Sequence, residues 1–298
     1  MPELPDVTVY VECLARRVAG ARLDAVRLAS PFLLRSVDPP LADCHGRPVV
    51  GVERIGKRIA IGLEGERYLV LHLMIAGRLR WAAVGAKIPG RIGLAAFDFS
   101  SGTLLLTEAG TKKRAALHVV RGRGGLSAHD AGGIDPLACT ATELASALRR
   151  EAHTIKRALT DPRVLSGIGN AYSDEILHRA RMSPFQRADR LDDAAIAQLR
   201  EAMRAVLAEW TERLRREAGD GFPLKVTAFR DGMAVHGRFR QPCPACGSPV
   251  QRIVYADNEA NYCATCQTGG RLLADRALSR LLREDWPRTL EELEQLRR

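Results

Sequence analysis

Four cysteines near the C-terminal end constrain the fold of this chain more than any other feature. They form two pairs with two intervening residues each, Cys243 with Cys246 and Cys263 with Cys266, and sixteen residues separate the pairs. Two such knuckles bring four thiolates to the corners of a tetrahedron, the geometry that Zn²⁺ prefers. Because every position is a thiolate, no coordination site stays open for a substrate. The pattern therefore predicts one structural zinc ion.

The other cysteines and the N-terminal segment indicate the compartment. Cys13, Cys44 and Cys139 are isolated in the sequence, which is typical of small buried side chains. Closely paired cysteines in a reducing compartment indicate metal binding rather than disulfides. The first twenty residues hold three acidic side chains and no apolar signal block, and no apolar run reaches the roughly 20 residues that span a bilayer. We therefore expect a cytoplasmic protein, associated with the nucleoid in a bacterium, without a signal peptide or a membrane partner.

The charge of the chain narrows the class of partner. The formal net charge is +10, and most of the basic residues are arginines. Arginine binds phosphate in a bidentate manner, so this balance favours a polyanionic partner such as nucleic acid. Many basic proteins bind no nucleic acid, however, and the charge alone does not decide.

The N-terminal part combines one helix with many short strands. Apolar side chains at helical spacing over residues 7–18 predict a helix that ends near Gly20. Short β-like runs follow from about residue 22 to 120, several of them separated by glycine-containing turns. Strands of this spacing indicate an antiparallel sandwich or barrel. The predicted strands cover Val49–Ile55, Arg58–Leu63, Tyr68–Met74, Leu94–Phe99 and Thr103–Thr107.

From residue 140 the pattern becomes helical. The preceding residues 121–136 are rich in Gly, Ser, Asp and Pro and predict a linker. Thr140 with Glu143 has the spacing of a capping box, and Thr289 with Glu292 repeats it. The predicted elements are helices over 142–150, 154–160, 170–180 and 192–217, a loop over 219–241, a strand over 251–255 with a return strand from about 257, and a helical stretch to the C-terminus.

A tight glycine turn opens directly into one of these helices. Its residues are Gly167, Ile168, Gly169 and Asn170. Free backbone N–H groups at a helix start bind anions, and glycines let a phosphate approach the backbone. Asn170 can cap the helix and donate to the phosphate, and Lys156 on the preceding helix can face the same anion. A lone Gly-x-Gly-Asn run is also typical of an ordinary helix–helix turn, so this DNA-binding assignment depends on the rest of the sequence.

The N-terminus carries the most specific resemblance. The run Met1-Pro2-Glu3-Leu4-Pro5-Asp6-Val7 resembles the start of the formamidopyrimidine-DNA glycosylase/endonuclease VIII family. The resemblance spans about residues 2–268. It includes a basic strand with Lys57, a loop starting at His72, a helix-two-turn-helix motif over 155–178, the run Val235-His236-Gly237-Arg238 and the cysteine finger.

This resemblance implies a multi-domain α+β fold. It consists of an N-terminal helix with an antiparallel β-sandwich, a helical helix-two-turn-helix domain and a C-terminal β-hairpin zinc finger. The expected divisions are a catalytic β-sandwich domain at 1–125, a linker at 126–139, the DNA-binding helical domain at 140–235, the zinc finger at 236–268 and a helical extension at 269–298.

The chemistry can be followed at the N-terminus itself. Once Met1 is removed, the amine of Pro2 has an ordinary pKa of roughly 7.7–8.0, which leaves a usable neutral fraction near pH 7. Its attack on C1′ displaces the base, and the resulting iminium acidifies the C2′ proton, so that β- and then δ-elimination can cut the strand. Glu3 is placed to protonate the sugar ring oxygen and then shuttle protons. The base must be flipped out of the duplex to expose C1′.

The resemblance assigns roles to the matching residues. It implies that Pro2, Glu3 and Lys57 are the catalytic residues, with Lys57 on a phosphate near the lesion, and that His72 binds DNA. A packed histidine at a strand end is the alternative for His72. The implied substrate is double-stranded damaged DNA carrying an oxidised base or an abasic site, and we expect a monomer.

Two loops depart from the family pattern. Members fill the gap left by the flipped base with side chains from two loops, and here Met74 or Ile75 can be the wedge in the first. The second loop usually offers an Arg-Phe pair, whereas residues 108–115 contain no aromatic side chain. Asp6 stands where glutamate is common.

The finger and the C-terminus also depart from the pattern. The finger usually carries an arginine five residues before the third cysteine, and this position is Asn258. Arg252 or Arg271 can substitute for it. Beyond the finger, about thirty further residues carry an apolar helical stripe, which predicts packing on the protein's own surface or, as the alternative, a partner contact. The stripe comprises Leu272, Leu273, Leu278, Leu281, Leu282 and Trp286.

Two other function classes remain open at this point. A non-catalytic zinc protein that binds damaged or abasic DNA would carry the same charge and finger, and a retained Met1 would favour it. A zinc-ribbon protein that binds RNA or the ribosome fits the charge but leaves Pro2, Glu3 and the glycine turn unexplained.

Overall fold

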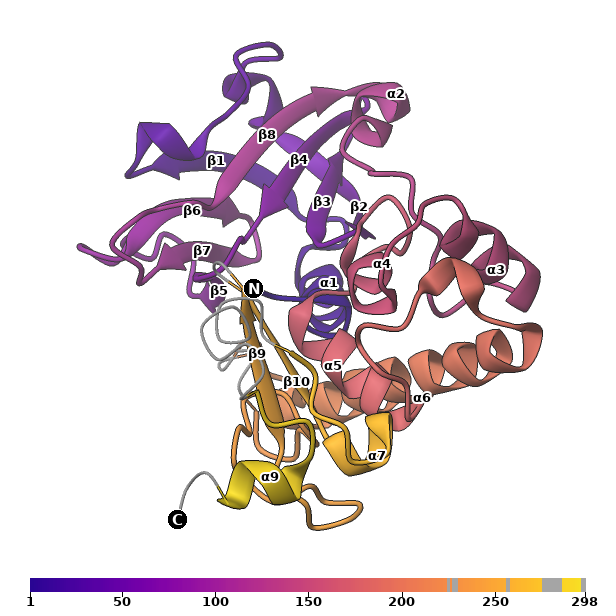
Figure 1. The fold of residues 1–298 in the computed structure, drawn as a ribbon. Coiled ribbons are helices and arrows are strands. Elements are labelled where there is room, and N and C mark those ends of the chain that lie inside the picture. Colours follow the sequence, from indigo (N-terminus) through magenta and orange to yellow (C-terminus); the bar gives the residue numbers. More distant parts are fainter. Residues whose placement is uncertain (224–225, 227–229, 256–257, 275–285, 296–298) are drawn as a thin grey trace. The chain divides into compact units, whose positions relative to one another are not determined.

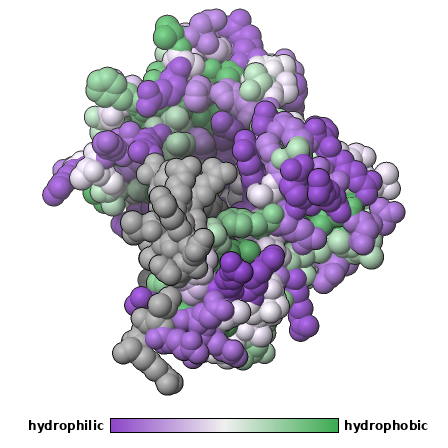
Figure 2. All heavy atoms as spheres, viewed as in Figure 1, coloured by the Kyte–Doolittle hydropathy of each residue, from purple (hydrophilic) through white to green (hydrophobic). Residues whose placement is uncertain are grey.

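The computed structural model describes residues 1–223, 226, 230–255, 258–274 and 286–295. The chain divides into two compact units (Figure 1). Unit 1 comprises Met1–Ala131 and Glu209–Thr227, and unit 2 comprises Gly132–Ala208 and Ala228–Arg298. Most of the face drawn in Figure 2 is hydrophilic, as the basic composition requires. None of the described helices is both long and apolar enough to cross a membrane.

Unit 1 begins with helix α1 (Leu4–Val18). Pro5 lies in its first turn, where the missing N–H of proline costs nothing, and Arg16 and Arg17 complement the helix dipole in its last turn. The helix ends close to the predicted stop, and its buried apolar face packs against β2 and β3. This packing fixes the residues immediately before the helix, Pro2 and Glu3, against the strands.

Eight antiparallel strands form the rest of this unit. They hydrogen-bond in the order β5-β7-β6-β1-β2-β3-β4-β8. The two halves of this order meet at β1 and β2, which pair through Arg22–Pro48 and Leu23–Arg47. The expected β-sandwich is confirmed. The strands are β1 (Arg22–Leu28), β2 (Arg47–Ile55), β3 (Arg58–Leu63), β4 (Arg67–His72), β5 (Gly77–Ala82), β6 (Gly93–Phe99), β7 (Gly102–Glu108) and β8 (Ala116–Arg121).

Three of these strands, β1, β5 and β8, were not among the five that the sequence predicts. In β1 the register shifts between Leu23 and Ala25, which breaks the alternation by which a strand is recognised. Short 3-10 turns η1 (Pro31–Leu33) and η2 (Leu41–Cys44) occupy the connection from β1 to β2.

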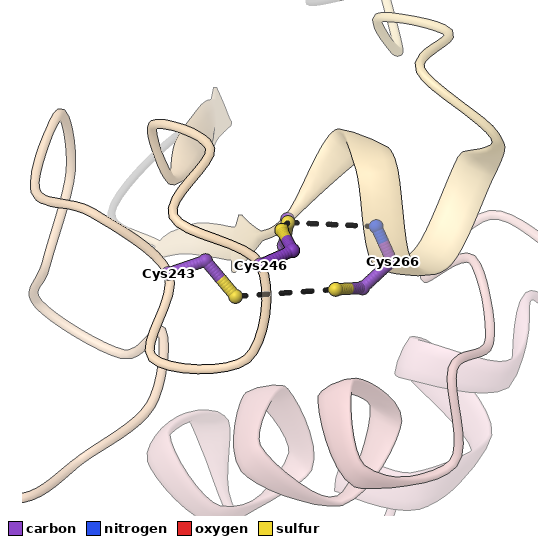
Figure 3. A group of neighbouring side chains, drawn as sticks. Cys243, Cys246 and Cys266 are labelled. Atoms are coloured by element: carbon purple, nitrogen blue, oxygen red, sulfur yellow. Dashed lines mark hydrogen bonds between the residues drawn. The ribbon is translucent and has the colours of Figure 1, made fainter.

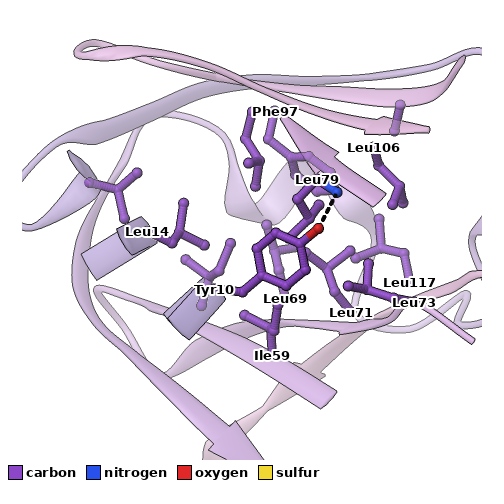
Figure 4. Close-up of a cluster of buried hydrophobic side chains, with 14 of the residues drawn as sticks. Tyr10, Leu14, Ile59, Leu69, Leu71, Leu73, Leu79, Phe97, Leu106 and Leu117 are labelled. Atoms are coloured by element: carbon purple, nitrogen blue, oxygen red, sulfur yellow. Dashed lines mark hydrogen bonds between the residues drawn. The ribbon is translucent and has the colours of Figure 1, made fainter. Parts of the chain in front are cut away.

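One hydrophobic core joins both halves of the sandwich to α1. Tyr10 of α1 lies among Leu69 and Leu71 from one half and Leu79 and Phe97 from the other (Figure 4). The backbone N–H of Leu79 donates to the Tyr10 hydroxyl at 3.5 Å. Leu214, Phe222 and Val226 from the C-terminal half of the chain complete this core. Because Tyr10 buries its hydroxyl with a partner, α1 is held in one orientation against the strands.

The glycine-rich segment after β8 is not wholly a linker. Helix α2 (Gly122–Ser127) forms there, although glycine is a poor helix former. Leu126 explains the difference, because it is buried in a satellite core with Ile55, Ala60 and Tyr68. Tertiary burial therefore overrides local propensity in these six residues.

Unit 2 contains the remaining described helices, with α6 shared between the units, and the zinc hairpin. Thr140 caps α3 with a complete capping box to Glu143, as predicted. In the hairpin, β9 covers the predicted strand and pairs with β10 from Tyr255–Asn258 to Gln251–Tyr262. The elements are α3 (Ala141–Arg149), α4 (Ile155–Thr160), α5 (Asn170–Arg179), η3 (Ala188–Arg190), α6 (Asp193–Ala218, which continues into unit 1), β9 (Gln251–Tyr255), β10 (Asn258–Tyr262), α7 (Ala264–Thr268) and α9 (Leu290–Gln295).

The C-terminal extension packs on the zinc hairpin of its own chain. Leu272 and Leu273 are buried with Ile253 and Tyr262 of the hairpin, and the N–H of Leu273 donates to the Tyr262 hydroxyl at 2.8 Å. Both leucines lie in an irregular segment rather than in the predicted helix. The predicted positions Leu278, Leu281 and Leu282 lie outside the described residues. At the start of α9, the Thr289 hydroxyl accepts a hydrogen bond from the N–H of Glu292, as in the predicted capping box. The Glu292 carboxylate, however, accepts from the N–H of Arg288 instead of that of Thr289, so the second half of the capping box does not form.

Candidate active site and zinc centre

The residues that follow Met1 in unit 1 form a buried, charged site, although Met1 itself is 38% exposed. Pro2 is buried, and Glu3 is only 3% exposed. Glu3 is the N-cap of α1, and its N–H donates to the Asp6 carboxylate at 2.9 Å. Asp6, the shorter carboxylate that departs from the family pattern, therefore acts within the first turn and orients the backbone of Glu3.

Two cations of unit 1, Lys57 and Arg78, lie close enough to this N-terminus for their charges to act on it. Lys57 lies in the tight turn between β2 and β3, where Gly56 adopts the left-handed conformation that a two-residue hairpin turn requires. Burial lowers the pKa of Lys57, and the negative charge of Glu3 opposes that shift. Burial also lowers the pKa of the Met1 amine; the charge of Glu3 opposes that shift, as does that of Asp6, whereas Arg78 and Lys57 act in the same direction as burial. We expect the same surroundings to act on the Pro2 amine once Met1 is removed. A lower pKa leaves more of the amine neutral and nucleophilic near pH 7.

His72 lies at the end of β4, opposite Arg58 of β3 and Ala116 of β8. Burial, followed by the positive charges of Arg58 and Lys57, lowers its pKa to about 4. The imidazole is therefore neutral near pH 7 and offers a phosphate an N–H group rather than a charge.

The turn after His72 presents one exposed apolar side chain. Gly77 is required in this turn, because a Cβ there would lie 2.3 Å from the carbonyl oxygen of Leu73. Met74 adopts a positive φ of 52°, which is strained for a side chain of this type. Ile75 at the tip is 55% exposed. Arg78 donates to the carbonyls of Gly77 and Ile75 at 2.7 and 3.3 Å and so holds the turn closed.

The loop after β7 is organised by a residue that the sequence did not indicate. Glu108 is 1% exposed, and its carboxylate accepts from the backbone N–H groups of Arg114 and Ala115 at 2.9 and 3.2 Å. Residues 111–114 between them are exposed. A glutamate that closes an apolar strand and precedes a basic loop was the available signal.

In unit 2 the glycine turn leads into α5 as expected. Gly167 has a φ of 89°, and Gly169 rather than Asn170 is the N-cap, so that Asn170 is the first helical residue. Gly167 and Gly169 are buried, whereas Asn170 is half-buried. The N–H groups of the first helical turn therefore lie next to a partly accessible side chain.

Lys156 is buried and hydrogen-bonds to other residues of the protein. It is 5% exposed, and its ammonium donates to the carbonyl of Asn170 at 2.8 Å, the hydroxyl of Ser173 at 2.8 Å and the carboxylate of Asp174 at 2.5 Å. These three acceptors match the three N–H groups of a lysine. The phosphate contact predicted for Lys156 stays a prediction, whereas its hydrogen bond to the carbonyl of Asn170 at the start of α5 is direct.

Asp174 extends this arrangement to the zinc hairpin. Its second oxygen lies 2.7 Å from Nδ1 of His236 and 3.3 Å from the amide nitrogen of Asn261 in β10. The neighbouring Glu175 accepts three backbone N–H groups from residues 234–236. Two adjacent carboxylates of α5 thus hold the segment that resembles the family's Val-x-Gly-Arg run.

The four cysteines converge as the sequence predicts, and Figure 3 labels three of them, Cys243, Cys246 and Cys266. Their sulfur atoms all lie within 4.8 Å of one another, with Cys243 and Cys266 at 4.0 Å and Cys246 and Cys263 at 3.4 Å. A tetrahedron with zinc–sulfur bonds of about 2.3 Å has edges of about 3.8 Å, so the donor set fits zinc. Burial raises the pKa of the Cys266 thiol to about 11, and the metal would supply the charge that stabilises the thiolate.

The structure also places Asn258, which departs from the finger pattern, and its two candidate substitutes, Arg252 and Arg271. Asn258 begins β10 opposite Tyr255. Arg252 lies over the ring of Phe239 at 4.6 Å and 3.5 Å from the carboxylate of Glu259. Arg271 is exposed at the start of the C-terminal extension.

These features define a zinc-hairpin protein with a buried N-terminal proline on a β-sandwich. Three family models match the chain: the formamidopyrimidine-DNA glycosylase N-terminal domain over residues 1–117, its helix-two-turn-helix domain over 133–217, and a zinc finger of these glycosylases and isoleucyl-tRNA synthetases over 240–269.

Curated relatives are similar to this chain over most of its length. A formamidopyrimidine-DNA glycosylase of Thermus thermophilus is 33% identical over 91% of this chain and 100% of its own length. One of Pelotomaculum thermopropionicum is 31% identical over 90% and 99%. An uncharacterised formamidopyrimidine-DNA glycosylase-like protein of Mycobacterium tuberculosis is 46% identical over 51% of this chain and 94% of its own length.

The solved structures agree in fold. The Lactococcus lactis enzyme in complex with DNA containing an abasic site superposes with a TM-score of 0.77 at 21% identity, covering 89% of this chain and 99% of that one. The chain belongs to the formamidopyrimidine-DNA glycosylase family.

Proposed function

We propose that this chain is a base-excision DNA glycosylase and AP lyase whose nucleophile is the amine of Pro2. The observation that carries the proposal is the burial of Pro2 and Glu3 at the start of α1, where burial also lowers the pKa of the Met1 amine next to them. An ordinary N-terminus would be solvated and would keep its usual pKa. Membership of the glycosylase family supports the same activity.

The reaction starts from the neutral amine of Pro2 after removal of Met1. The nitrogen lone pair forms a bond to C1′ of the flipped nucleotide, and the bond from C1′ to the base breaks, with the electron pair and a proton going to the base. Glu3 donates a proton to the sugar ring oxygen, and opening of the ring gives the iminium. Loss of the C2′ proton then expels the 3′ phosphate by β-elimination, and a second elimination can release the 5′ phosphate. Water hydrolyses the remaining iminium and restores the amine.

The surrounding residues position the DNA for this chemistry. Lys57 is close enough to Glu3 for their charges to interact, so a phosphate held by Lys57 would place C1′ near the amine. His72 would donate an N–H group to a neighbouring phosphate. Of the two wedge candidates, the exposure of Ile75 at the tip of a closed turn favours Ile75 over Met74.

The second part of the DNA contact would come from unit 2. The N–H groups at the Gly167–Asn170 turn would bind a phosphate, with Lys156 supporting the turn from inside. The structural zinc would hold the hairpin and takes no part in the covalent steps. The Lactococcus lactis structures contain abasic-site, oxidised-pyrimidine and Fapy-dG DNA, and we infer oxidised bases as the substrate class here. We further infer a monomer that acts on double-stranded DNA in the cytoplasm, at the nucleoid of a bacterium.

Borohydride trapping on a duplex with one abasic site tests the proposal. The wild-type chain should give a covalent adduct that peptide mapping places on the Pro2 nitrogen. Pro2→Gly should weaken trapping and Glu3→Gln should strongly reduce base release. Tight binding without an adduct, with Met1 shown to be absent, would instead favour a non-catalytic damage-binding protein. Preference for single-stranded RNA over the abasic duplex would contradict both.

A further inference from the structure

The last turn of α5 reaches a zinc ligand. Nε2 of His178 lies 3.2 Å from the sulfur of Cys243, which belongs to the first knuckle. The two residues are 65 positions apart in the sequence, and both belong to unit 2. Nothing in the cysteine spacing indicates this contact.

The direction of this hydrogen bond is fixed once zinc is bound. Zinc binds cysteine as the thiolate, which has no proton to donate. The shared proton must therefore lie on Nε2 of His178, and the sulfur of Cys243 is the acceptor.

The sulfur atoms differ in where their hydrogen bonds originate. The sulfur of Cys263 accepts a hydrogen bond from the backbone N–H of Cys266, and Cys246 is hydrogen-bonded to Ser248. Both partners lie in or next to the same knuckle as the cysteine. Cys243 is 2% exposed and packs among the apolar side chains of Val235 and Val250. The hydrogen-bond partner of its sulfur is the His178 side chain of α5, a helix outside the hairpin.

We propose that His178 is a positioning residue of the zinc centre. Its N–H group draws charge from the Cys243 thiolate, which makes that sulfur less reactive toward competing metals and oxidants, and it fixes the orientation of the first knuckle on α5. Because α5 begins at the Gly167–Asn170 turn, the same helix joins the zinc centre to the proposed phosphate site over a length of about 15 Å.

Two substitutions separate the hydrogen bond from packing. His178→Phe keeps an aromatic ring of similar size and removes the donor, whereas His178→Gln keeps a side-chain N–H group at a similar reach. Asn261→Ala is the matched control, because it removes another contact between α5 and the hairpin, at 3.3 Å from Asp174, without touching a sulfur. Zinc release from the full chain would be followed with a chromogenic chelator, with and without hydrogen peroxide.

Zinc should leave the His178→Phe variant about tenfold faster than the wild type, because outer-shell partners typically change metal affinity by about 10–100-fold. His178→Gln and Asn261→Ala should release zinc at close to the wild-type rate. Equal rates for wild type and His178→Phe would overturn the proposal, as would equally fast release from Asn261→Ala.

A spectrum of the unmodified protein gives a second test that depends on no variant. In the zinc-loaded wild type, ¹⁵N resonances of His178 should show Nε2 protonated. An imidazole with its proton on Nδ1 alone would overturn the proposal even if every variant failed to fold.

Discussion

Lys57 and Lys156 lie in different units, and both were expected to contact DNA phosphates, yet their surroundings differ. Lys156 donates to three acceptors, one of them a carboxylate at 2.5 Å, so its buried charge is compensated within the protein. Lys57 is desolvated enough for burial to lower its pKa, with Glu3 as the opposing charge. The difference teaches that a buried cation whose partners are complete supports structure, whereas one with an uncompensated desolvation cost is available to a substrate.

The largest expected effect concerns Lys156. Lys156→Met should lower the free energy of unfolding by about 3–5 kcal/mol, because Asp174 would remain as a buried carboxylate without its cation. Urea denaturation of the zinc-loaded protein measures this change. Adding Asp174→Asn should recover part of the loss. Equal losses in Lys156→Met and Lys57→Met would remove the distinction between the two lysines.

The substitution of Lys57 should show the converse behaviour. Lys57→Met should reduce the rate of borohydride trapping about a hundredfold, since an electrostatic contact near the reacting atoms is lost, while the unfolding free energy changes by less than about 1 kcal/mol. Lys87→Met is the control, because Lys87 is exposed in the connection between β5 and β6. A trapping rate within twofold of wild type would exclude Lys57 from the site.

His72 extends the comparison to pH. Its pKa falls from 6.5 to about 4 on folding, so the unfolded chain binds a proton that the folded chain does not between these values. Its contribution to stability is therefore complete above pH 6.5 and is lost as the pH falls toward 4. By pH 5 the loss should reach about 2 kcal/mol, and His72→Gln should show a correspondingly flatter dependence in urea denaturation between pH 7 and 5. An unchanged slope would contradict the assigned burial.

Arg78 should have the smallest effect and tests the electrostatics of the amine. Its positive charge lowers the pKa of the Met1 amine, and we expect it to act in the same sense on the Pro2 amine once Met1 is removed. The neutral Pro2 amine is the proposed nucleophile. Arg78→Gln should therefore raise that pKa and move the rising limb of the trapping rate to higher pH. Arg80→Gln, on an exposed position of the same strand, is the matched control. A shift to lower pH would show that the charges around the N-terminus act in the opposite sense.

Several elements could be predicted because their signals are local. The capping box of Thr140, the strand at Gln251–Tyr255 and the two cysteine knuckles each depend on residues only a few positions apart. Strand β1 was missed because its register shift hides the alternation, and α2 was missed because glycines hide a buried Leu126.

The sequence by itself determined the zinc ligands and the order of the structural parts, since spacing along the chain fixes which donor atoms can meet. Only the tertiary structure decided which charges are compensated: the three acceptors around Lys156, the carboxylate of Glu108 that organises its loop, and the imidazole of His178 at the sulfur of Cys243. These contacts join residues brought together by burial. Burial is a property of the whole packed chain, which no local pattern encodes.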